Sequence, residues 1–352
     1  MLYTKFFSIL VSFTLVAVLS TQKLTRAENN LRKETCGKGL KLKKSYGRKV
    51  LNGVKSRITD APWNVAIEVL NEKESGLCTG TLISTRHVIT ARHCFAFLTD
   101  DGYVSSANEE KIEGCQNEEE KDVVMTGNFS NSFRLYAGVG CGYRKHCPGS
   151  SFSLMEISKI ILPKICDDKQ LDFDDFAIVE LSESLNFSER IRAICVAEDH
   201  VLEIGNDVQM RLYGYGLDPS SGNNSAGILK YETVKAERCF KTTKKAFCTR
   251  SISQKQLACV GDSGGGVVRM VNDRVTVVGV IYQGVTCESS TTNELDYVAS
   301  VAYYSADICE YTGICADDGV NLKKNTQLST NQTSASRQYL SMMILMFLVL
   351  VE

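Results

Sequence analysis

The chain has 352 residues, a formal net charge of −1 at pH 7 and 43% hydrophobic residues. This near-neutral balance gives no reason to expect a nucleic-acid partner, and the length allows two packed units once terminal segments are set aside. Fourteen cysteines, an even number, indicate disulfides formed in an oxidising compartment. Cysteines in an oxidising compartment are not expected to bind a metal, and no cluster of histidines accompanies them, so neither a metal site nor a cofactor is predicted.

The N-terminus is typical of a secretory signal peptide. Lys5 precedes an apolar run over residues 6–19, and small residues follow it. Residues 1–20 are therefore expected to be removed, which makes the mature protein secreted and extracellular. The alternative is an uncleaved membrane anchor, but the run is short for a helix that spans a bilayer.

Residues 21–49 are expected to form a basic pro-segment. Residues 31–49 carry eight lysines or arginines against one acid, Glu34. Such a run is typical of a solvated linker, and binding of a heparin-like polyanion is the alternative.

From Val65 onward the chain shows short alternating runs that predict β-strands. Asn272 and Asp273 are expected to turn a hairpin, and no long helical periodicity precedes Ala302. Many short strands joined by polar turns favour barrels or sandwiches. The expected strands are residues 64–70, 79–84, 133–139, 175–181, 208–213, 267–270 and 275–282.

Residues 100–131 are acidic and poor in apolar side chains, which predicts a surface insertion between strands. N-glycosylation sequons, which fit exposed loops of a secreted protein, are also present. They begin at Asn128, Asn186, Asn223 and Asn331.

The C-terminus combines a polar tail, residues 316–339, with a hydrophobic tail, residues 340–352. About a dozen apolar residues are too few to cross a bilayer core of about 30 Å as a helix. Small residues, a polar spacer and a terminal apolar tail resemble a signal for a glycosylphosphatidylinositol anchor. Ser329, Asn331 and Ser334 are candidate attachment points, and a disordered tail is the alternative.

Three side chains in separate segments point to nucleophilic catalysis. A serine hydroxyl is a poor nucleophile near neutral pH unless an imidazole takes its proton and a carboxylate orients that imidazole. The chain carries His93, Asp175 and Ser263 in this order. The glycine-rich segment around Ser263 follows Cys259 and fits a tight turn whose N–H groups converge on a developing oxyanion.

These segments, together with residues 50–53, 62–63 and 214–216, resemble the trypsin/chymotrypsin family of serine proteases over residues 36 to 304. The resemblance implies an all-β fold for a domain at residues 50–315: two antiparallel six-stranded β-barrels with the active site in the cleft between them, followed by a short C-terminal helix. His93 and Asp175 would come from the first barrel and Ser263 from the second.

The family resemblance also implies an activity, a serine endopeptidase that forms an acyl-enzyme. The backbone N–H groups of Gly261 and Ser263 would form the oxyanion hole. The protein would be a zymogen that an activating protease cuts after Lys49. The new α-amine of Val50 would then pair with Asp262. The expected partners are this protease and a protein or peptide substrate, with membrane contact only through a lipid anchor.

The resemblance further implies a set of disulfides, and Cys309 and Cys315 are expected to pair locally. The remaining four cysteines, Cys115, Cys141, Cys147 and Cys166, leave three pairings open. The pairs carried over from the family are Cys36–Cys195, Cys78–Cys94, Cys239–Cys248 and Cys259–Cys287.

The substrate pocket departs from the trypsin pattern. Where trypsin-like enzymes have an aspartate, two residues before Cys259, this chain has Leu257, followed by Ala258. An apolar floor favours an apolar or aromatic substrate side chain. Asp296, expected on the pocket wall with Gly284, would instead favour a basic one, so both preferences stay open and the apolar one is favoured.

Other departures support an alternative function, a catalytically weak or inactive homologue that binds a partner protein. Tyr282 stands where a serine usually supports the catalytic aspartate, Gly266 stands where proline is usual, and Arg92 precedes His93 where a small residue is usual. Because His93 and Ser263 are both retained, the enzyme is the favoured hypothesis.

Overall fold

The computed structural model describes residues 23–42, 53–71, 75–113, 121–140, 152–165, 175–199, 208–217, 227–239, 243–252, 258–284 and 295–316. Several expectations lie outside these ranges. They concern the signal peptide, the C-terminal tails, Lys49, Val50, Leu257, Cys287, Asn223, Asn331 and the four cysteines Cys115, Cys141, Cys147 and Cys166.

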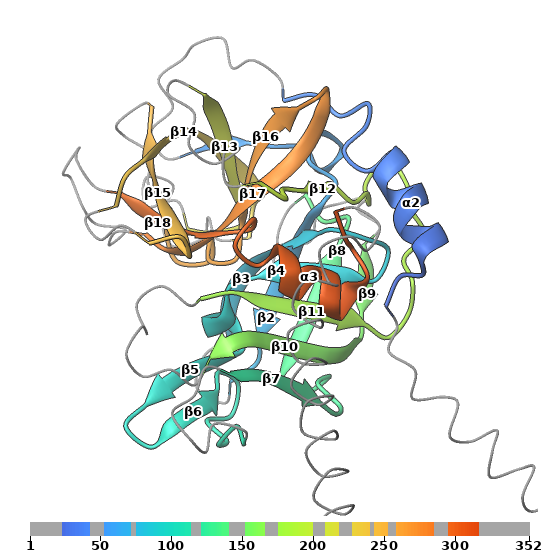
Figure 1. Ribbon diagram of the computed structural model, residues 1–352. Coiled ribbons are helices and arrows are strands. Elements are labelled where there is room, and N and C mark those ends of the chain that lie inside the picture. The colour runs from blue at the N-terminus through green and yellow to red at the C-terminus, as the bar shows by residue number, and fades with distance from the viewer. Residues whose placement is uncertain are drawn as a thin grey trace, which may run out of the picture. The chain divides into compact units, whose positions relative to one another are not determined.

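An antiparallel sheet occupies the first half of the domain (Figure 1). Its strand order is β7-β10-β11-β4-β3-β2-β8-β9. The strands are β2 (Asn64–Val69), β3 (Gly76–Leu82), β4 (His87–Thr90), β7 (Lys121–Thr126), β8 (Phe133–Ala137), β9 (Ser153–Met155), β10 (Ile157–Ile165) and β11 (Ala177–Leu181). All positions of β2, β4 and β11 are buried, so these strands form the centre of the first core.

The second sheet closes on itself, because β14 pairs with β13 on one side and with β15 on the other. Strands β14, β13, β16, β17, β18 and β15 thus form a six-stranded barrel, which β1 and β12 extend. The strands are β1 (Val54–Lys55), β12 (Cys195–Val196), β13 (Gln209–Gly214), β14 (Lys230–Glu237), β15 (Ala246–Ser251), β16 (Gly266–Val271), β17 (Arg274–Gln283) and β18 (Asp296–Ser300).

The all-β, two-barrel type of fold expected from the sequence is confirmed, and each expected strand overlaps an observed one. Among the described residues, the second sheet is a closed six-stranded barrel, whereas the first is a half-barrel sheet of eight strands instead of the expected closed barrel of six. Asn272 and Asp273 turn the β16–β17 hairpin with φ of 48° and 59°. Two successive positive φ values are the signature of a type I′ turn, whose twist matches that of the flanking strands.

Buried aromatic side chains join the two halves of the domain. Trp63, just before β2, packs edge-to-face on Tyr213 of β13 with ring centroids 5.3 Å apart. The Tyr215 hydroxyl donates a hydrogen bond of 2.8 Å to the carbonyl oxygen of Val139, after β8. These contacts fix the second barrel on the first, which matters because the candidate site draws on both.

A ten-residue helix, α2 (Arg26–Thr35), lies near the N-terminus, so the expectation of a solvated linker over residues 31–49 is wrong for residues 31–35. A capping box starts the helix. The Thr25 hydroxyl accepts from the Glu28 backbone N–H, and the Glu28 carboxylate accepts from the Thr25 N–H at 2.7 Å. The Thr-x-x-Glu spacing carries this signal, but the dense positive charge obscured it.

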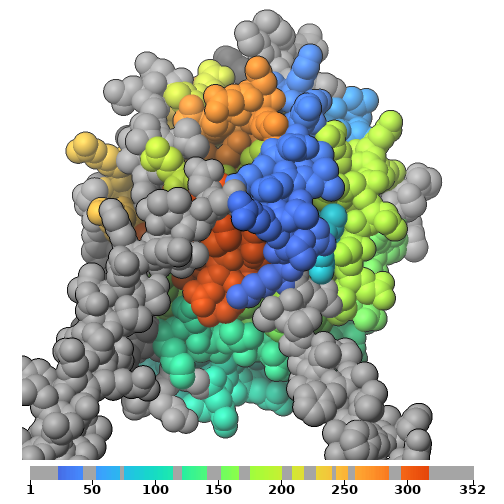
Figure 2. Space-filling model, turned by 45° about the vertical axis from the view of Figure 1, so that its right-hand side comes forward, coloured from blue at the N-terminus to red at the C-terminus, as the bar shows by residue number. Residues whose placement is uncertain are grey.

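The expected C-terminal helix is α3 (Ser305–Thr312), which ends at Gly313 in the left-handed conformation with φ of 74°. In the space-filling view α2 and α3 lie against each other on one face (Figure 2). The Leu24 N–H donates to the carbonyl oxygen of Thr312 at 2.8 Å. An added Cβ at Gly313 would come within 2.3 Å of the Leu24 carbonyl oxygen, so this approach needs glycine.

Residues 100–131 contribute regular structure to the domain. Strand β6 (Gly102–Ser105) forms a two-stranded sheet with β5 (Ala96–Thr99), and β7 joins the first sheet beside β10. In the part of the chain that the structure describes, no helix is both long and apolar enough to cross a membrane.

Candidate active site

Strand register brings His93 and Asp175 together. Strands β4 and β11 are antiparallel neighbours, and Thr90 faces Ala177 across them. The chain leaves β4 and turns through a short 3-10 helix, Arg92–Cys94. Antiparallel strands keep opposite residues adjacent. Asp175, two positions before Ala177, therefore lies next to this turn. The Cys78–Cys94 disulfide then ties the turn to β3.

His93 makes two hydrogen bonds to the Asp175 carboxylate. The ring Nδ1 lies 2.7 Å from Oδ2, and the backbone N–H donates to Oδ1 at 2.9 Å. A carboxylate only accepts, so Nδ1 carries the proton and Nε2 is the basic nitrogen of the neutral ring. The side chain of Asp175 is 11% exposed and that of His93 is 35% exposed, so the carboxylate is sheltered while the imidazole remains accessible.

Charge coupling shifts both pKa values. Burial alone would lower the pKa of His93, but the charge and hydrogen bond of Asp175 outweigh burial and raise it. Burial alone would raise the pKa of Asp175, but His93 and Arg92 hold it below its usual value. The pair therefore keeps the carboxylate ionised and favours the imidazolium that proton transfer creates.

Ser263 comes from the second barrel and is held against the first. Its carbonyl oxygen accepts from the Thr79 N–H at 2.7 Å and lies 3.9 Å from Cys94 Sγ. At the next residue, Gly264, an added Cβ would come within 2.0 Å of Thr90 Oγ1 and 3.1 Å of the Ala91 nitrogen. The Ser263–Gly264 backbone thus rests beside the segment that leads into His93.

The turn before Ser263 uses glycine where the backbone requires it. Gly261 has φ of 101°, a conformation that residues with a Cβ rarely adopt. The Thr79 hydroxyl donates a hydrogen bond of 2.8 Å to the Gly261 carbonyl oxygen. The Gly265 N–H donates one of 2.8 Å to the Asp262 carbonyl oxygen. The backbone of residues 261–265 is therefore held from both sides.

The buried Asp262 carboxylate is held by two backbone N–H groups. Its carboxylate accepts from the N–H groups of Gly216 at 2.8 Å and Cys259 at 2.9 Å. Burial raises the pKa of Asp262 to about 6, although the two N–H groups and the Lys230 charge act in the opposite direction. An added Cβ at Gly214 would lie 2.1 Å from Oδ1, so the carboxylate fills the space above this strand.

The structure gives a physical reason for two departures from the family pattern. Arg92 is buried, and its guanidinium donates to the Tyr103 hydroxyl at 3.1 Å and lies over that ring, so it packs on the β5–β6 hairpin. Gly266 lies against Thr81 of β3, where an added Cβ would come within 2.5 Å of Oγ1. Tyr282 is buried, and its ring lies 6.3 Å from that of Tyr297.

Other expected residues are placed as follows. Three of the expected disulfides are present, and Cys259, Cys309 and Cys315 are also disulfide-bonded. Asn128 and Asn186 are exposed. Cys78, His93 and Cys94 approach one another within 4.8 Å, but both sulfurs belong to one disulfide and cannot ligate a metal as thiolates. The three disulfides are Cys36–Cys195, Cys78–Cys94 and Cys239–Cys248.

Of the pocket residues predicted from the sequence, the structure describes Ala258, Gly284 and Asp296. An added Cβ at Gly284 would come within 2.6 Å of the Ala258 carbonyl oxygen, so these two segments touch. Asp296 is buried at the start of β18, next to Tyr297, which faces Gln283 in the register.

Sequence reasoning missed Ser106, whose hydroxyl donates to the His93 carbonyl oxygen at 2.8 Å, and no pattern marks it.

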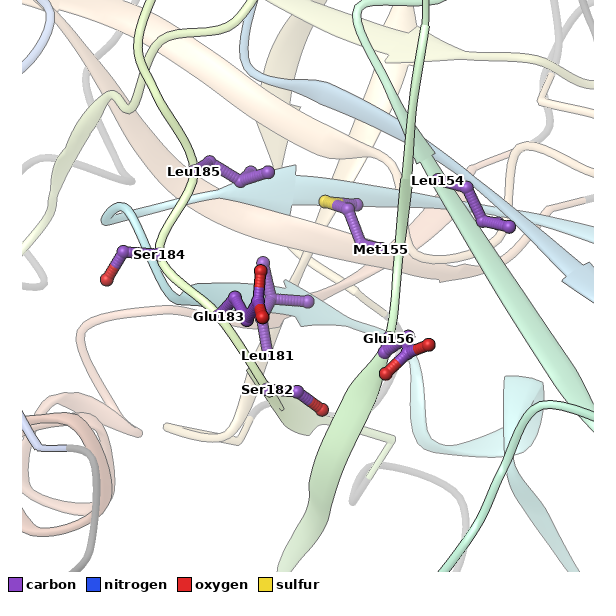
Figure 3. A pocket seen from close by; sticks show the side chains of 8 residues that line it. All are labelled: Leu154, Met155, Glu156, Leu181, Ser182, Glu183, Ser184 and Leu185. Carbon is purple, nitrogen blue, oxygen red and sulfur yellow. The ribbon is translucent and has the colours of Figure 1, made fainter.

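A surface cavity of about 260 Å³ lies elsewhere (Figure 3). Residues 154–156 and 181–185 line it, from the β9–β10 junction and the segment after β11. It contains none of the site residues named above.

A two-barrel fold with a histidine–aspartate pair from one barrel and a Gly-Asp-Ser-Gly turn from the other defines the trypsin-like serine protease class. A family model described as the nematode trypsin-6-like family matches residues 6–315. The chain therefore belongs to this family.

Curated relatives agree with this assignment. The chain is 29% identical over 276 residues to tissue-type plasminogen activator of Sus scrofa, an alignment that covers 72% of this chain and 43% of the relative. It is 28% identical over 293 residues to that of Mus musculus, covering 75% of this chain and 46% of the relative. The chain thus spans less than half the length of these relatives.

Proposed function

We propose that this protein is a secreted serine endopeptidase that works through His93, Asp175 and Ser263. The observation that carries the proposal is the double hydrogen bond from His93 to one sheltered carboxylate, beside the turn that presents Ser263. Fixing the ring through both its backbone and Nδ1 leaves Nε2 as the proton acceptor. A general base in a fixed tautomer is what activation of a serine hydroxyl needs.

The proposed reaction starts when Ser263 Oγ attacks a peptide carbonyl carbon and His93 Nε2 takes its proton. Asp175 stabilises the resulting imidazolium, consistent with the raised pKa of His93. His93 then donates this proton to the leaving amine, which leaves an acyl-enzyme. Water, deprotonated by the same nitrogen, hydrolyses the ester and restores Ser263.

The oxyanion of each tetrahedral intermediate would be bound by the backbone N–H groups of Gly261 and Ser263. Donors of this kind stabilise the transition state by about 3–4 kcal/mol each in acyl transfer. The contacts that hold the backbone of residues 261–265 support the proposal, because such donors act only when they are fixed before the reaction.

The same proposal makes the chain a zymogen that is cut after Lys49. The new α-amine of Val50 would pair with Asp262. Burial raises the pKa of this carboxyl to about 6, so a neighbouring cation would stabilise its ionised form. The described chain resumes at Gly53, and an added Cβ there would lie 3.3 Å from the side chain of Lys230, the cation already acting on Asp262. Gly53, three residues after the proposed new N-terminus, thus lies beside this lysine, which supports the proposal.

Disulfides in the structure fit an oxidising compartment, which supports a secreted, extracellular, glycosylated protein with protein or peptide substrates. Anchoring of the C-terminus to a lipid remains part of this proposal.

Labelling with a fluorophosphonate, before and after a cut at Lys49, tests the function. The wild-type protein should label only after the cut, and Ser263→Ala should not label. A cut, folded wild-type protein that fails to label would favour the partner-binding homologue instead.

A further inference from the structure

We propose that the β5–β6 hairpin positions the general base, and that Ser106, the residue directly after β6, is the positioning residue through which the hairpin acts. This inference rests on the proposed endopeptidase function and adds a residue to the machinery of the same site. It also gives a role in catalysis to the acidic interval of residues 100–131, which composition alone marks as a surface insertion.

Side chains from two distant segments hold the main chain on both sides of the His93 Cα. The Asp175 carboxylate accepts from the His93 backbone N–H at 2.9 Å. The partly buried hydroxyl of Ser106 donates to the His93 carbonyl oxygen at 2.8 Å. Two planar peptide groups flank each Cα and together set the direction of its Cα–Cβ bond. Holding both of them therefore fixes the direction from which the imidazole enters the site.

The turn that carries His93 is short and depends on such support. It is one 3-10 turn of three residues, Arg92–Cys94, and no side chain caps its start at Ala91. Hydrogen bonds in 3-10 turns have poorer geometry than those of an α-helix. The disulfide at Cys94 anchors the end of the turn, whereas Ser106 acts on His93 itself.

Further contacts dock the hairpin on this turn. The Ser106 N–H donates to the Phe95 carbonyl oxygen at 2.9 Å. The Arg92 guanidinium donates to the Tyr103 hydroxyl at 3.1 Å and lies 5.2 Å from the centre of the Tyr103 ring. The end of the hairpin therefore contacts the residue before His93, His93 itself and a residue after it.

A donor can position its acceptor only when the donor is itself held, and the hairpin meets this condition. The Ser105 N–H donates to the Glu110 carbonyl oxygen at 2.8 Å, and the Ile112 N–H donates to the Tyr103 carbonyl oxygen at 2.8 Å. Phe95, at the start of the hairpin, is fully buried and packs edge-to-face on a phenylalanine of β8 with ring centroids 4.8 Å apart. The hairpin is thus attached to the first core.

The first test removes the hydroxyl of Ser106. In the cut protein, Ser106→Ala should lower kcat by about tenfold with little change in KM, because the lost hydrogen bond orients the general base. Ser106→Thr keeps the donor and should restore most of the rate. The rate at which a fluorophosphonate labels Ser263 should fall and recover in parallel with kcat.

Thr99→Val is the matched control. Thr99 ends strand β5 of the same hairpin, and its hydroxyl donates to the Gly102 carbonyl oxygen, also at 2.8 Å. Valine keeps the branched shape and removes the hydroxyl, so kcat should equal that of wild type. A loss as large as that of Ser106→Ala would show that the stability of the hairpin sets the rate, and it would overturn the inference.

A second readout does not depend on activity. The proton that His93 Nδ1 donates to Asp175 can be followed by NMR, and its exchange with solvent reports how firmly the imidazole is held. This proton should exchange faster in Ser106→Ala than in wild type, and at the wild-type rate in Thr99→Val.

The outcomes separate the two proposals. Absence of labelling in cut wild-type protein would remove the endopeptidase function itself. Normal labelling of wild type with an unchanged kcat in Ser106→Ala would overturn this inference alone. If Ser106→Ala does not fold, Tyr103→Phe provides the test, because it removes only the hydroxyl that binds Arg92. It should lower kcat severalfold, and an unchanged kcat would overturn the inference.

Discussion

His93 and Asp175 are joined twice, through the imidazole Nδ1 at 2.7 Å and through the histidine backbone N–H at 2.9 Å. The hydrogen bond from the backbone N–H fixes the main chain of His93, and the one at Nδ1 fixes its ring. The Asp175 carboxylate therefore sets both the position and the tautomer of His93. Phe176, next to Asp175, stacks on Tyr304 with centroids 4.3 Å apart, which anchors the carboxylate from the other side.

Replacing Asp175 with asparagine tests this relationship. The amide can donate to Nδ1, which would place the proton on Nε2 and abolish the general base. We expect kcat to fall by about 10⁴-fold while the fold is kept. Peptidase assays with circular dichroism as the control check this outcome, and a loss smaller than tenfold would show that Asp175 does not set the tautomer.

The pH profile of labelling should report the His93 pair. The pKa of His93 is raised, mainly because Asp175 outweighs burial. The protonated ring cannot accept the Ser263 proton, so the labelling rate should rise with pH through a midpoint above the usual histidine value of about 6.5. Arg92 lowers this pKa, so Arg92→Gln should move the midpoint to higher pH. A shift to lower pH would contradict the assigned electrostatics.

Asp262 should make the stability of the uncut protein depend on pH. Burial raises its folded pKa to about 6, whereas an unfolded aspartate titrates near 3.9. A raised folded pKa contributes stability that is complete below the unfolded value and is lost as pH rises through the folded value. Thermal unfolding of uncut wild-type protein should show this loss between about pH 4 and pH 6, and uncut Asp262→Asn should not. Identical profiles would contradict the raised pKa.

The contact between Gly266 and Thr81 predicts a coupled pair. Gly266→Ala would place a Cβ within 2.5 Å of Thr81 Oγ1, and overpacking of this kind destabilises by about 1–3 kcal/mol. Adding Thr81→Ala removes the obstructing hydroxyl and should restore part of the loss. Denaturant unfolding of the two single variants and the double variant measures the coupling, and simple additivity would show that the contact is unimportant.

The Cys36–Cys195 bridge, with a sequence separation of 159, should keep the N-terminal segment attached after a cut at Lys49. A non-reducing denaturing gel should show one band, which becomes two after reduction. Cys36→Ser with Cys195→Ser should give two bands without reductant. A single band from the cut double variant would require another covalent link.

The sequence predicted the fold and most of the candidate site because its signals are local. Short alternating runs marked the strands, and Asn272-Asp273 marked a turn that the observed dihedral angles confirm. Helix α2 was missed because its capping box, Thr25 to Glu28, sits before a dense run of positive charge. Local charge dominated that interpretation, whereas contacts with the folded domain stabilise the helix.

What the sequence could not show depends on contacts between distant segments. The direction of Arg92 is set by Tyr103, which lies in the acidic interval that sequence composition marked as a surface insertion. The hydrogen bond from Ser106 to the His93 carbonyl oxygen forms because the β5–β6 hairpin folds back on the turn that carries His93. Neither relationship leaves a pattern in the order of residues.

The most direct test of the central claim is to locate the fluorophosphonate adduct by mass spectrometry of peptides from the cut protein. The account predicts a single adduct on Ser263 that disappears in His93→Ala. An adduct at another residue, or full labelling of Ser263 in His93→Ala, would contradict it.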